Sequence, residues 1–386
     1  MGVKMTTLRV PVQPKILDWA ETRSLQDPEL LRAHFPKLDD WKEGTVQPTL
    51  KQLEDFASFT HTPFGLLMLS EPPVDQLPIP DFRTMPSERF ERPSPDLLET
   101  IYICQERQDW YRDFMREIDE RPLWFVGKET IRSNVKTVAD EIRKTIGLDI
   151  DERRRYATWQ EALRSFIAHA DDAGILVMCS GVVGNNNHRL LDTHEFRGFA
   201  LADPVAPLVF INGADSKSAQ MFTLAHELAH IWLGFTALSD VPVTNGEQND
   251  TELWCNRVAA EMLVPEGVFR TTFNRDAVRD DEILRMSRIF KVSTLVIIRR
   301  MLDLGFLTSG EYWEMYHREE DKLRRLPKRN GGNFFLTQAA RTSKRFTRAL
   351  IISTLEGHTL HRDALRYLGL TKTETFHKLG QSLGVV

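Results

Sequence analysis

The chain has 386 residues, of which 41% are hydrophobic and 27% charged, and its formal net charge at pH 7 is −5. This length and composition predict a globular protein of two to three domains. No apolar run approaches 18 residues, no signal peptide opens the chain, and the three scattered cysteines form no disulfide framework, so we expect a cytoplasmic protein without a membrane partner.

Residues 1–70 predict a helical module. Helical spacing covers residues 14–22, and Asp27 followed by Pro28 is typical of a helix start. An apolar ladder over residues 50–59 predicts a final helix. Together with the Trp-x-Glu-Gly and Pro-Thr sequences of residues 41–49, these features resemble a helix-turn-helix domain of the Xre type.

This module departs from the Xre pattern in two respects. Only 11 positions separate Leu30 from Trp41, and Pro36 interrupts them, so the turn and recognition helix have less room than usual. Residues 1–71 carry eight basic and ten acidic side chains, which leaves no surplus positive charge for phosphate groups. We interpret the module as a degenerate helix-turn-helix domain that mediates protein interaction or homodimer formation, with direct DNA binding as the alternative.

Residues 71–96 contain seven prolines, a density that forbids helix and predicts an extended linker or a belt on the next domain. That domain, residues 97–275, combines long amphipathic helices with short apolar strands. The expected helices span residues 97–120, 128–146 and 159–173, and the expected strands span residues 175–178, 196–201 and 208–211. The predicted fold class is therefore mainly α with a small β-sheet (α+β).

The sequence His226-Glu227-Leu228-Ala229-His230 is the most informative feature of this domain. It lies in a run without Gly or Pro that continues to Leu233, and Gly234 follows as a natural stop, so we expect the motif on a buried helix. The four-residue spacing puts both imidazoles on one face of that helix, close enough to bind one metal ion. Glu227 is then placed to take a proton from the water that the metal activates, as in zinc hydrolases.

A third ligand is expected from a second helix at residues 251–263. Glu252 is the first candidate, and Glu261, near the end of the same helix, is the second. Asn256 lies one turn after Glu252 and could orient a histidine ring through its side-chain amide. Two histidines and one glutamate leave a zinc position open for water, which is the catalytic pattern. The alternative is a buried helix whose histidines bond to the backbone and whose Glu227 pairs with an arginine.

These residues together resemble the ImmA/IrrE family of metallo-endopeptidases. The resemblance rests on the motif within residues 222–230, on Glu252 and Asn256, and on the Ala-Ala-Glu-x-Leu-x-Pro stretch at residues 259–265. It implies a zincin-like core in which the two histidines and Glu252 bind zinc and Glu227 is the general base. Members of this family act on transcriptional repressors or lie beside them, and some are fused to Xre-type modules and encoded with toxins.

Two helical regions are expected after the motif. Residues 276–326 contain a helix, a short turn and a second helix that carries Arg299 and Arg300, which is a helix-turn-helix-like layout; a hairpin packed on the peptidase core is the alternative. Residues 327–386 predict a basic helical C-terminal domain. From Lys322 to Arg348 there are nine Lys or Arg and no Asp or Glu, which indicates either a surface for nucleic acid or an acidic protein, or a solvated linker.

Two functions are compatible with this organisation. The first is a zinc-dependent endopeptidase coupled to transcriptional regulation, which cleaves a repressor or other regulatory protein. Its substrate strand would pair with the sheet edge near Phe196–Ala200. The second is an Xre-type regulator or an antitoxin of a toxin-antitoxin module, which binds a toxin or operator DNA and whose zinc is mainly structural.

Overall fold

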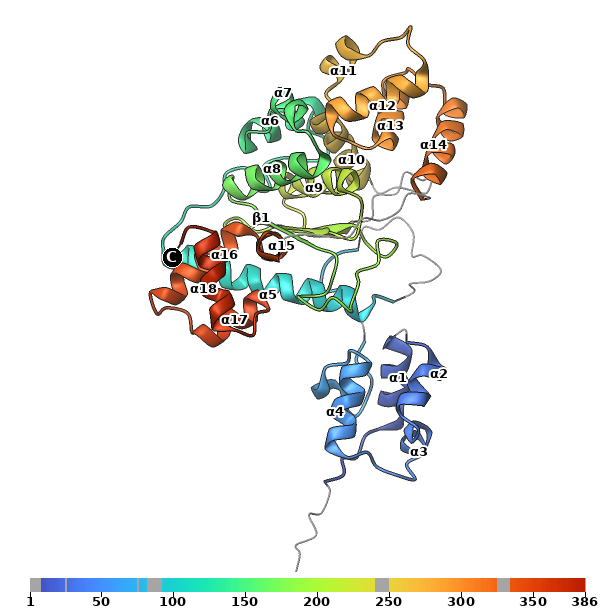
Figure 1. The fold of residues 1–386 in the computed structure, drawn as a ribbon, viewed down its shortest axis with the longest axis vertical. Coiled ribbons are helices and arrows are strands. Elements are labelled where there is room, and N and C mark those ends of the chain that lie inside the picture. Colours follow the sequence, from blue (N-terminus) through green and yellow to red (C-terminus); the bar gives the residue numbers. More distant parts are fainter. Residues whose placement is uncertain are drawn as a thin grey trace, which may run out of the picture. The chain divides into compact units, whose positions relative to one another are not determined.

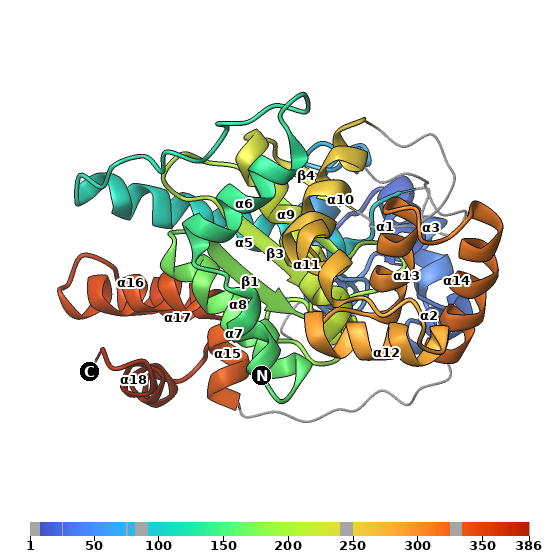
Figure 2. The ribbon, with the colours of Figure 1, turned by 90° about the horizontal axis from the view of Figure 1, so that it is seen from above.

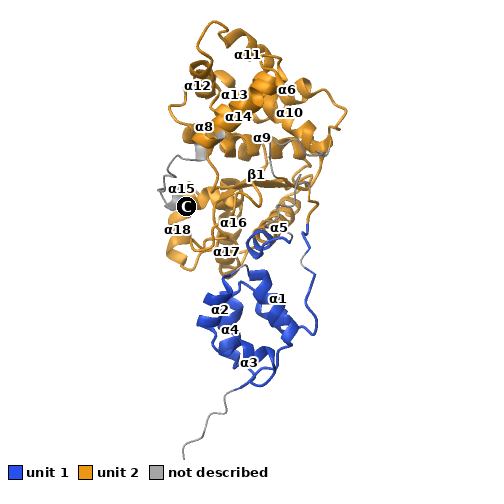
Figure 3. Ribbon diagram, turned by 90° about the vertical axis from the view of Figure 1, so that its right-hand side faces the viewer, with its two compact units in different colours: residues 1–78, 88–99 blue, residues 79–87, 100–386 orange. Residues whose placement is uncertain are grey.

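The computed structural model describes residues 8–24, 26–74, 76–81, 92–239, 250–324 and 334–385. The chain forms two compact units, coloured separately in Figure 3: residues 1–78 and 88–99 make unit 1, and residues 79–87 and 100–386 make unit 2. Each unit has its own hydrophobic core. No described helix is both long and apolar enough to cross a lipid bilayer. Residues 82–91 of the expected Pro-rich linker and residues 325–333 of the basic run lie outside the described residues.

Unit 1 packs short helices around an aromatic core. The Asp27 carboxylate accepts a hydrogen bond from the backbone of α2, and Thr49 and Gln52 form a capping box at the start of α4. Phe56 packs edge to face against Phe35 and Trp41. The helices are α1 (Pro14–Ser24), α2 (Pro28–His34), α3 (Leu38–Lys42), α4 (Leu50–Phe59) and the 3-10 helix η1 (Phe64–Met68).

The basic side chains of α2 and α3 are paired within unit 1. Lys42 lies 2.7 Å from a carboxylate oxygen of Asp18 and also contacts Glu21. Arg32 lies 3.6 Å from Glu21 and 3.5 Å from Asp39. The two helices have seven and five residues, so the second is short for a recognition helix in the major groove. These cations are engaged by carboxylates instead of being presented to phosphates.

The centre of unit 2 is a four-stranded mixed sheet in the order β1-β3-β2-β4. β1 pairs with β3 in parallel, and the other neighbours are antiparallel. The apolar runs predict the first three strands correctly, whereas the three residues of β4 give no recognisable pattern. The strands are β1 (Leu176–Ser180), β2 (Gly198–Leu201), β3 (Leu208–Asn212) and β4 (Ala237–Ser239).

Helices cover both faces of this sheet (Figure 1). α8 (Trp159–Asp172) and α9 (Lys217–Leu233) lie on one face, and α5 (Pro95–Glu117), α15 (Phe334–Thr342) and α16 (Lys344–Leu355) lie on the other. Seen from above, α8 and α9 cross over β1 and β3 (Figure 2). α10 (Asp250–Leu263) packs against α9 and against α6 (Val135–Ile146). The fold is mainly α with a small β-sheet, as the sequence predicts.

One helix begins later than its sequence pattern predicts. α6 starts at Val135 instead of residue 128, because the Asn134 side chain accepts a hydrogen bond from the first turn and caps the helix there. Upstream, the backbone N–H groups of Gly127 and Glu129 donate to the last carbonyls of α9. That pairing satisfies the end of α9 and keeps this segment out of α6.

The region after α10 has the expected helix-turn-helix layout. Lys291 ends α12 in the left-handed conformation with φ 53°, and the Ser293 side chain caps α13. Arg300 of α13 is buried and paired with Glu261 of α10, while Arg299 is paired within α13. These contacts support the hairpin alternative, in which the second helix packs on the core. The helices are α11 (Glu266–Thr272), α12 (Arg279–Phe290), α13 (Thr294–Asp303) and α14 (Ser309–Arg324).

The C-terminal region is helical, and Arg341 and Arg345 of its basic run donate hydrogen bonds to the rest of unit 2. α17 (His361–Leu368) and α18 (Thr373–Ser382) pack with α15 and α16, and Gly369 ends α17 in the left-handed conformation. Arg341 donates to the Asn185 side chain, and Arg345 donates to the Tyr111 hydroxyl at 2.6 Å. These two members of the basic run therefore contribute to packing against the body of unit 2.

Candidate metal centre

The sequence places both histidines of the motif on α9, a helix that is buried along most of its length. The Ser216 hydroxyl caps its first turn by accepting from the N–H of Ala219, and Gly234 ends it with φ 71°. A Cβ at Gly234 would lie 2.8 Å from the Cα of Gly127, so this close approach requires glycine as well as the left-handed conformation. The helix is thus fixed at both ends.

Three side chains from two helices meet at one point. His226 and His230 lie one turn apart on α9, and Glu252 comes from the first turn of α10. The Nε2 atoms of the histidines are 3.1 Å apart, and they lie 3.1 and 3.0 Å, respectively, from the two carboxylate oxygens of Glu252. All three residues are buried, with exposed fractions of 0%, 0% and 2%.

The donor atoms fit a bound cation. Nδ1 of His226 lies 3.0 Å from the amide oxygen of Asn256, which assigns the ring N–H to that nitrogen. In a neutral ring, Nε2 of His226 then presents a lone pair toward the other imidazole and the carboxylate. Electron-rich atoms spaced in this way match ligands around a tetrahedral zinc ion with bonds of about 2.0–2.2 Å. His226, His230 and Glu252 are therefore the residues that could hold a metal.

Glu227 lies beside this cluster but does not belong to it. It is completely buried, and its neighbours include the imidazole of His226 and the hydroxyl group of Ser239. Burial raises the pKa of Glu227 to about 8, although the neighbouring His226 opposes the rise. Burial raises the pKa of Glu252 as well. There, however, the two neighbouring imidazoles have the larger effect and lower the pKa to about 2. The two neighbouring carboxyl groups thus differ in the charge that surrounds them, and a bound cation would favour the anionic form of both.

Two residues that sequence analysis missed line the Glu227 side chain. A Cβ at Gly198 of β2 would lie 3.2 Å from Oε1 of Glu227, 2.5 Å from the Thr223 side chain and 2.8 Å from a backbone oxygen of β3. Gly198 pairs with Ser239 of β4, whose hydroxyl lies 3.4 Å from Nε2 of His230. Gly198 lies in the stretch Phe196–Ala200 that the sequence predicts as a substrate edge, but nothing in the sequence places Gly198 or Ser239 beside α9, because strand register brings them there.

Glu261, the second candidate for the third ligand, serves elsewhere. It forms a buried ion pair with Arg300 and accepts a hydrogen bond of 3.1 Å from the N–H of Glu266 at the start of α11. Arg300 and Arg143 also donate to backbone carbonyls at the end of α10, each at 2.9 Å. These arginines stabilise the carboxyl end of the helix that carries Glu252.

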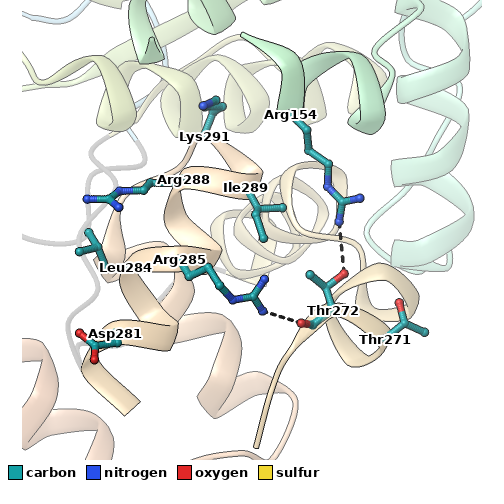
Figure 4. Close-up of a pocket in the computed structure, with 9 residues that line it drawn as sticks. All are labelled: Arg154, Thr271, Thr272, Asp281, Leu284, Arg285, Arg288, Ile289 and Lys291. Atoms are coloured by element: carbon teal, nitrogen blue, oxygen red, sulfur yellow. Dashed lines mark hydrogen bonds between the residues drawn. The ribbon is translucent and has the colours of Figure 1, made fainter. Parts of the chain in front are cut away.

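A surface pocket of about 860 Å³ lies between α7 (Ile150–Arg155), α11 and α12 (Figure 4), and none of His226, His230 and Glu252 lines it. Arg285 donates to the Thr272 carbonyl at 2.6 Å, and Arg154 donates to the Thr272 hydroxyl at 3.2 Å. Arg285 also pairs with the buried Glu282, and Arg154 with Asp151. Local carboxylates therefore balance these charges, and the lining contains no histidine or cysteine that would make a comparable metal site.

Comparison with known families finds a metallopeptidase-type region that includes the buried His-His-Glu group. Residues 170–302 match the model of the IrrE N-terminal-like domain, and this range contains the motif and α10. The match supports the resemblance to the ImmA/IrrE family and a metallopeptidase-type function for this part of the chain. Residues 342–382 match a domain of unknown function, DUF8813. No curated protein matches the chain.

Proposed function

We propose that the IrrE N-terminal-like region makes this protein a zinc-dependent endopeptidase of the gluzincin type that cleaves a repressor or other regulatory protein. In this proposal, His226, His230 and Glu252 bind zinc, and Glu227 is the general base. The observation that carries the proposal is the convergence of three buried donor groups 3.0–3.1 Å apart, next to the buried carboxyl group of Glu227.

In this mechanism, different side chains bind the metal, orient a ligand and transfer the proton. A zinc ion held by the two imidazoles and Glu252 would supply Lewis-acid activation of a water molecule and of the scissile carbonyl. Asn256 fixes the ring of His226 by accepting from Nδ1–H, so that Nε2 faces the centre. Glu227 takes a proton from the attacking water and passes it to the leaving amine. Burial raises the pKa of Glu227, and a bound cation would oppose this rise and favour the carboxylate that accepts the proton.

Proteolysis can be tested with candidate substrates encoded by neighbouring genes. Each purified candidate is incubated with the zinc-loaded protein or with its Glu227→Gln variant, and fragments are identified by mass spectrometry. We expect cleavage by the wild type and a rate about 10²–10⁴-fold lower in the variant, which is the usual contribution of general acid–base catalysis. The zinc content should be equal in both proteins. Cleavage that persists in the variant would refute the role of Glu227.

The second function is that of an Xre-type regulator or antitoxin in which zinc mainly stabilises the core. The burial of His226, His230 and Glu252 favours it, because a buried site is not open to a protein substrate; the three protein ligands, by contrast, leave a zinc position open, as in catalytic sites. This function predicts stable binding or neutralisation of a toxin, equally by the wild type and by Glu227→Gln. The charge pairing in unit 1 gives DNA binding less support than protein binding.

A further inference from the structure

The sheet edge beside the metal centre differs from the one expected from sequence. The expected edge, Phe196–Ala200, contains most of β2, which lies between β3 and β4 and therefore cannot accept another strand. β4 is the outer strand on this side of the sheet. Leu238 is its central residue, and the next residue, Ser239, contacts His230. An extended polypeptide that pairs with β4 would thus be guided toward the metal cluster.

The protein's own chain already occupies this edge. The N–H of Leu238 donates to the carbonyl of Pro80 at 3.0 Å, and Asp81 forms a parallel β-bridge with Leu238. We call Ile79–Asp81 the strap. It belongs to unit 2, although the chain on its N-terminal side, up to residue 78, belongs to unit 1. The strap therefore lies where a substrate strand would bind, and it is covalently continuous with the other unit.

The composition of the strap suits reversible pairing. Ile79 is buried with an exposed fraction of 5%, while its neighbours Pro78 and Pro80 are exposed. One side chain thus anchors the segment by burial of apolar surface. Pro80 lacks a backbone N–H, so it can accept from Leu238 but cannot donate to a strand, which prevents an extended ladder on β4.

We propose that the strap is an internal occupant of a polypeptide-binding edge and that it must leave β4 before an extended protein substrate can reach the metal centre. This proposal rests on the proposed endopeptidase function. The site beside this occupied edge is buried: the exposed fractions of its four residues do not exceed 2%. These residues are His226, Glu227, His230 and Glu252. The protein in this conformation is latent, and displacement of the strap exposes the Leu238 N–H to the incoming strand.

The test removes the anchor of the strap. In Ile79→Asp, a charge replaces the buried side chain, whereas Val74→Asp places the same charge at a position that is 78% exposed and serves as the matched control. Hydrogen exchange should show faster exchange at the Leu238 amide in Ile79→Asp alone. Hydrolysis of fluorescein-labelled casein, an unfolded polypeptide, should rise about tenfold, as expected if about one wild-type molecule in ten has the edge open. Ile79→Leu, which keeps an apolar anchor, should behave as the wild type.

The outcomes separate the strap from the endopeptidase function. An exposed Leu238 amide with unchanged casein hydrolysis in Ile79→Asp overturns the strap proposal and leaves the proposed function standing. If no variant hydrolyses casein, binding of the labelled casein to the zinc-loaded proteins is measured by fluorescence polarisation. Tighter binding by Ile79→Asp than by Val74→Asp then supports the strap, and equal binding overturns it. Should Ile79→Asp not fold, Ile79→Ala replaces it in the same comparison.

Discussion

Carboxylate groups are balanced differently in unit 1 and in the His226–His230–Glu252 group of unit 2. In unit 1, Lys42 contacts two carboxylates, so the chain supplies the counter-charge itself. In unit 2, Glu252 and two histidines face one another, and no described Lys or Arg forms an ion pair with Glu252 or Glu227. A buried carboxylate without such a partner is costly, unless a bound cation supplies the missing charge. The comparison therefore supports unit 2, and not unit 1, as the part of the chain in which we propose the metal site.

The largest expected effect comes from removing a proposed zinc ligand. His226→Ala should reduce bound zinc from about one ion per chain to nearly none and should lower peptide hydrolysis by at least about 10³-fold, since the metal supplies much of the transition-state stabilisation. Lys42→Ala in unit 1 should change neither quantity. Inductively coupled plasma mass spectrometry and a peptidase assay measure them. Full zinc content in His226→Ala would show that His226 is no more a zinc ligand than Lys42 of unit 1 is.

The next effect concerns the residue that orients His226. Asn256→Ala should weaken zinc binding about 10–100-fold, because groups that position a ligand ring usually contribute on this scale. Asn256→Asp keeps an oxygen acceptor for Nδ1–H and should retain most of the affinity. Competition with a zinc chelator gives the dissociation constants. Equal affinities in all three proteins would show that the ring needs no partner at Nδ1.

A buried acid in unit 2 should make stability depend on pH. Asp171 accepts hydrogen bonds from Ser343 at 2.7 Å and from the N–H of Val177, and burial raises its pKa from 3.8 to about 6. The folded state therefore holds the proton more tightly than the unfolded state does. This contribution is complete below about pH 4 and is lost as the pH rises through about 6, which lowers the free energy of unfolding by up to about 3 kcal/mol.

Urea unfolding between about pH 4 and pH 7 tests this dependence. Asp171→Asn has no proton to release, so its free energy of unfolding should fall less than that of the wild type over this range. The difference between the two pH profiles isolates Asp171 from the other carboxyl groups. Parallel profiles would mean that the carboxyl has similar pKa values in the folded and unfolded states.

The smallest effect compares one glycine from each unit. Gly198→Ala places a Cβ 2.5 Å from the Thr223 side chain and should cost about 1–3 kcal/mol, the usual range for overpacking. Gly44 has φ 73° and no atom within 4 Å of an added Cβ. Gly44→Ala should therefore cost only the strain of the left-handed conformation, about 1 kcal/mol. Urea unfolding measures both, and a larger loss at Gly44 would contradict the crowding around Glu227.

The sequence predicts the parts of the site that depend on helical spacing. The four-residue interval brings His226 and His230 together on α9, and one turn of α10 separates Glu252 from Asn256. The choice between Glu252 and Glu261 depends on how α9 packs against α10, and spacing alone cannot make that choice. Arg300, which the sequence suggests as part of a DNA-reading helix, instead binds Glu261 in the core.

Features that depend on strand register or on distant backbone contacts are not predictable in this way. Gly198 and Ser239 reach the site because β2 and β4 pair in one particular register. The segment before α6 has a helical pattern, but its N–H groups bind the end of α9. The strap lies in a stretch whose prolines predict an extended linker or a belt on the next domain, but they do not predict that it pairs with β4. In each case, contacts far along the chain decide between locally similar alternatives.

The most direct test of the metal centre is X-ray absorption spectroscopy of the protein purified without chelators. We expect about one zinc ion per chain with two imidazole nitrogens at about 2.0–2.1 Å and carboxylate oxygen at a similar distance. Glu252→Ala should remove the carboxylate oxygen, or the metal with it. A protein without stoichiometric metal, or a zinc shell unchanged in Glu252→Ala, would contradict the proposed site.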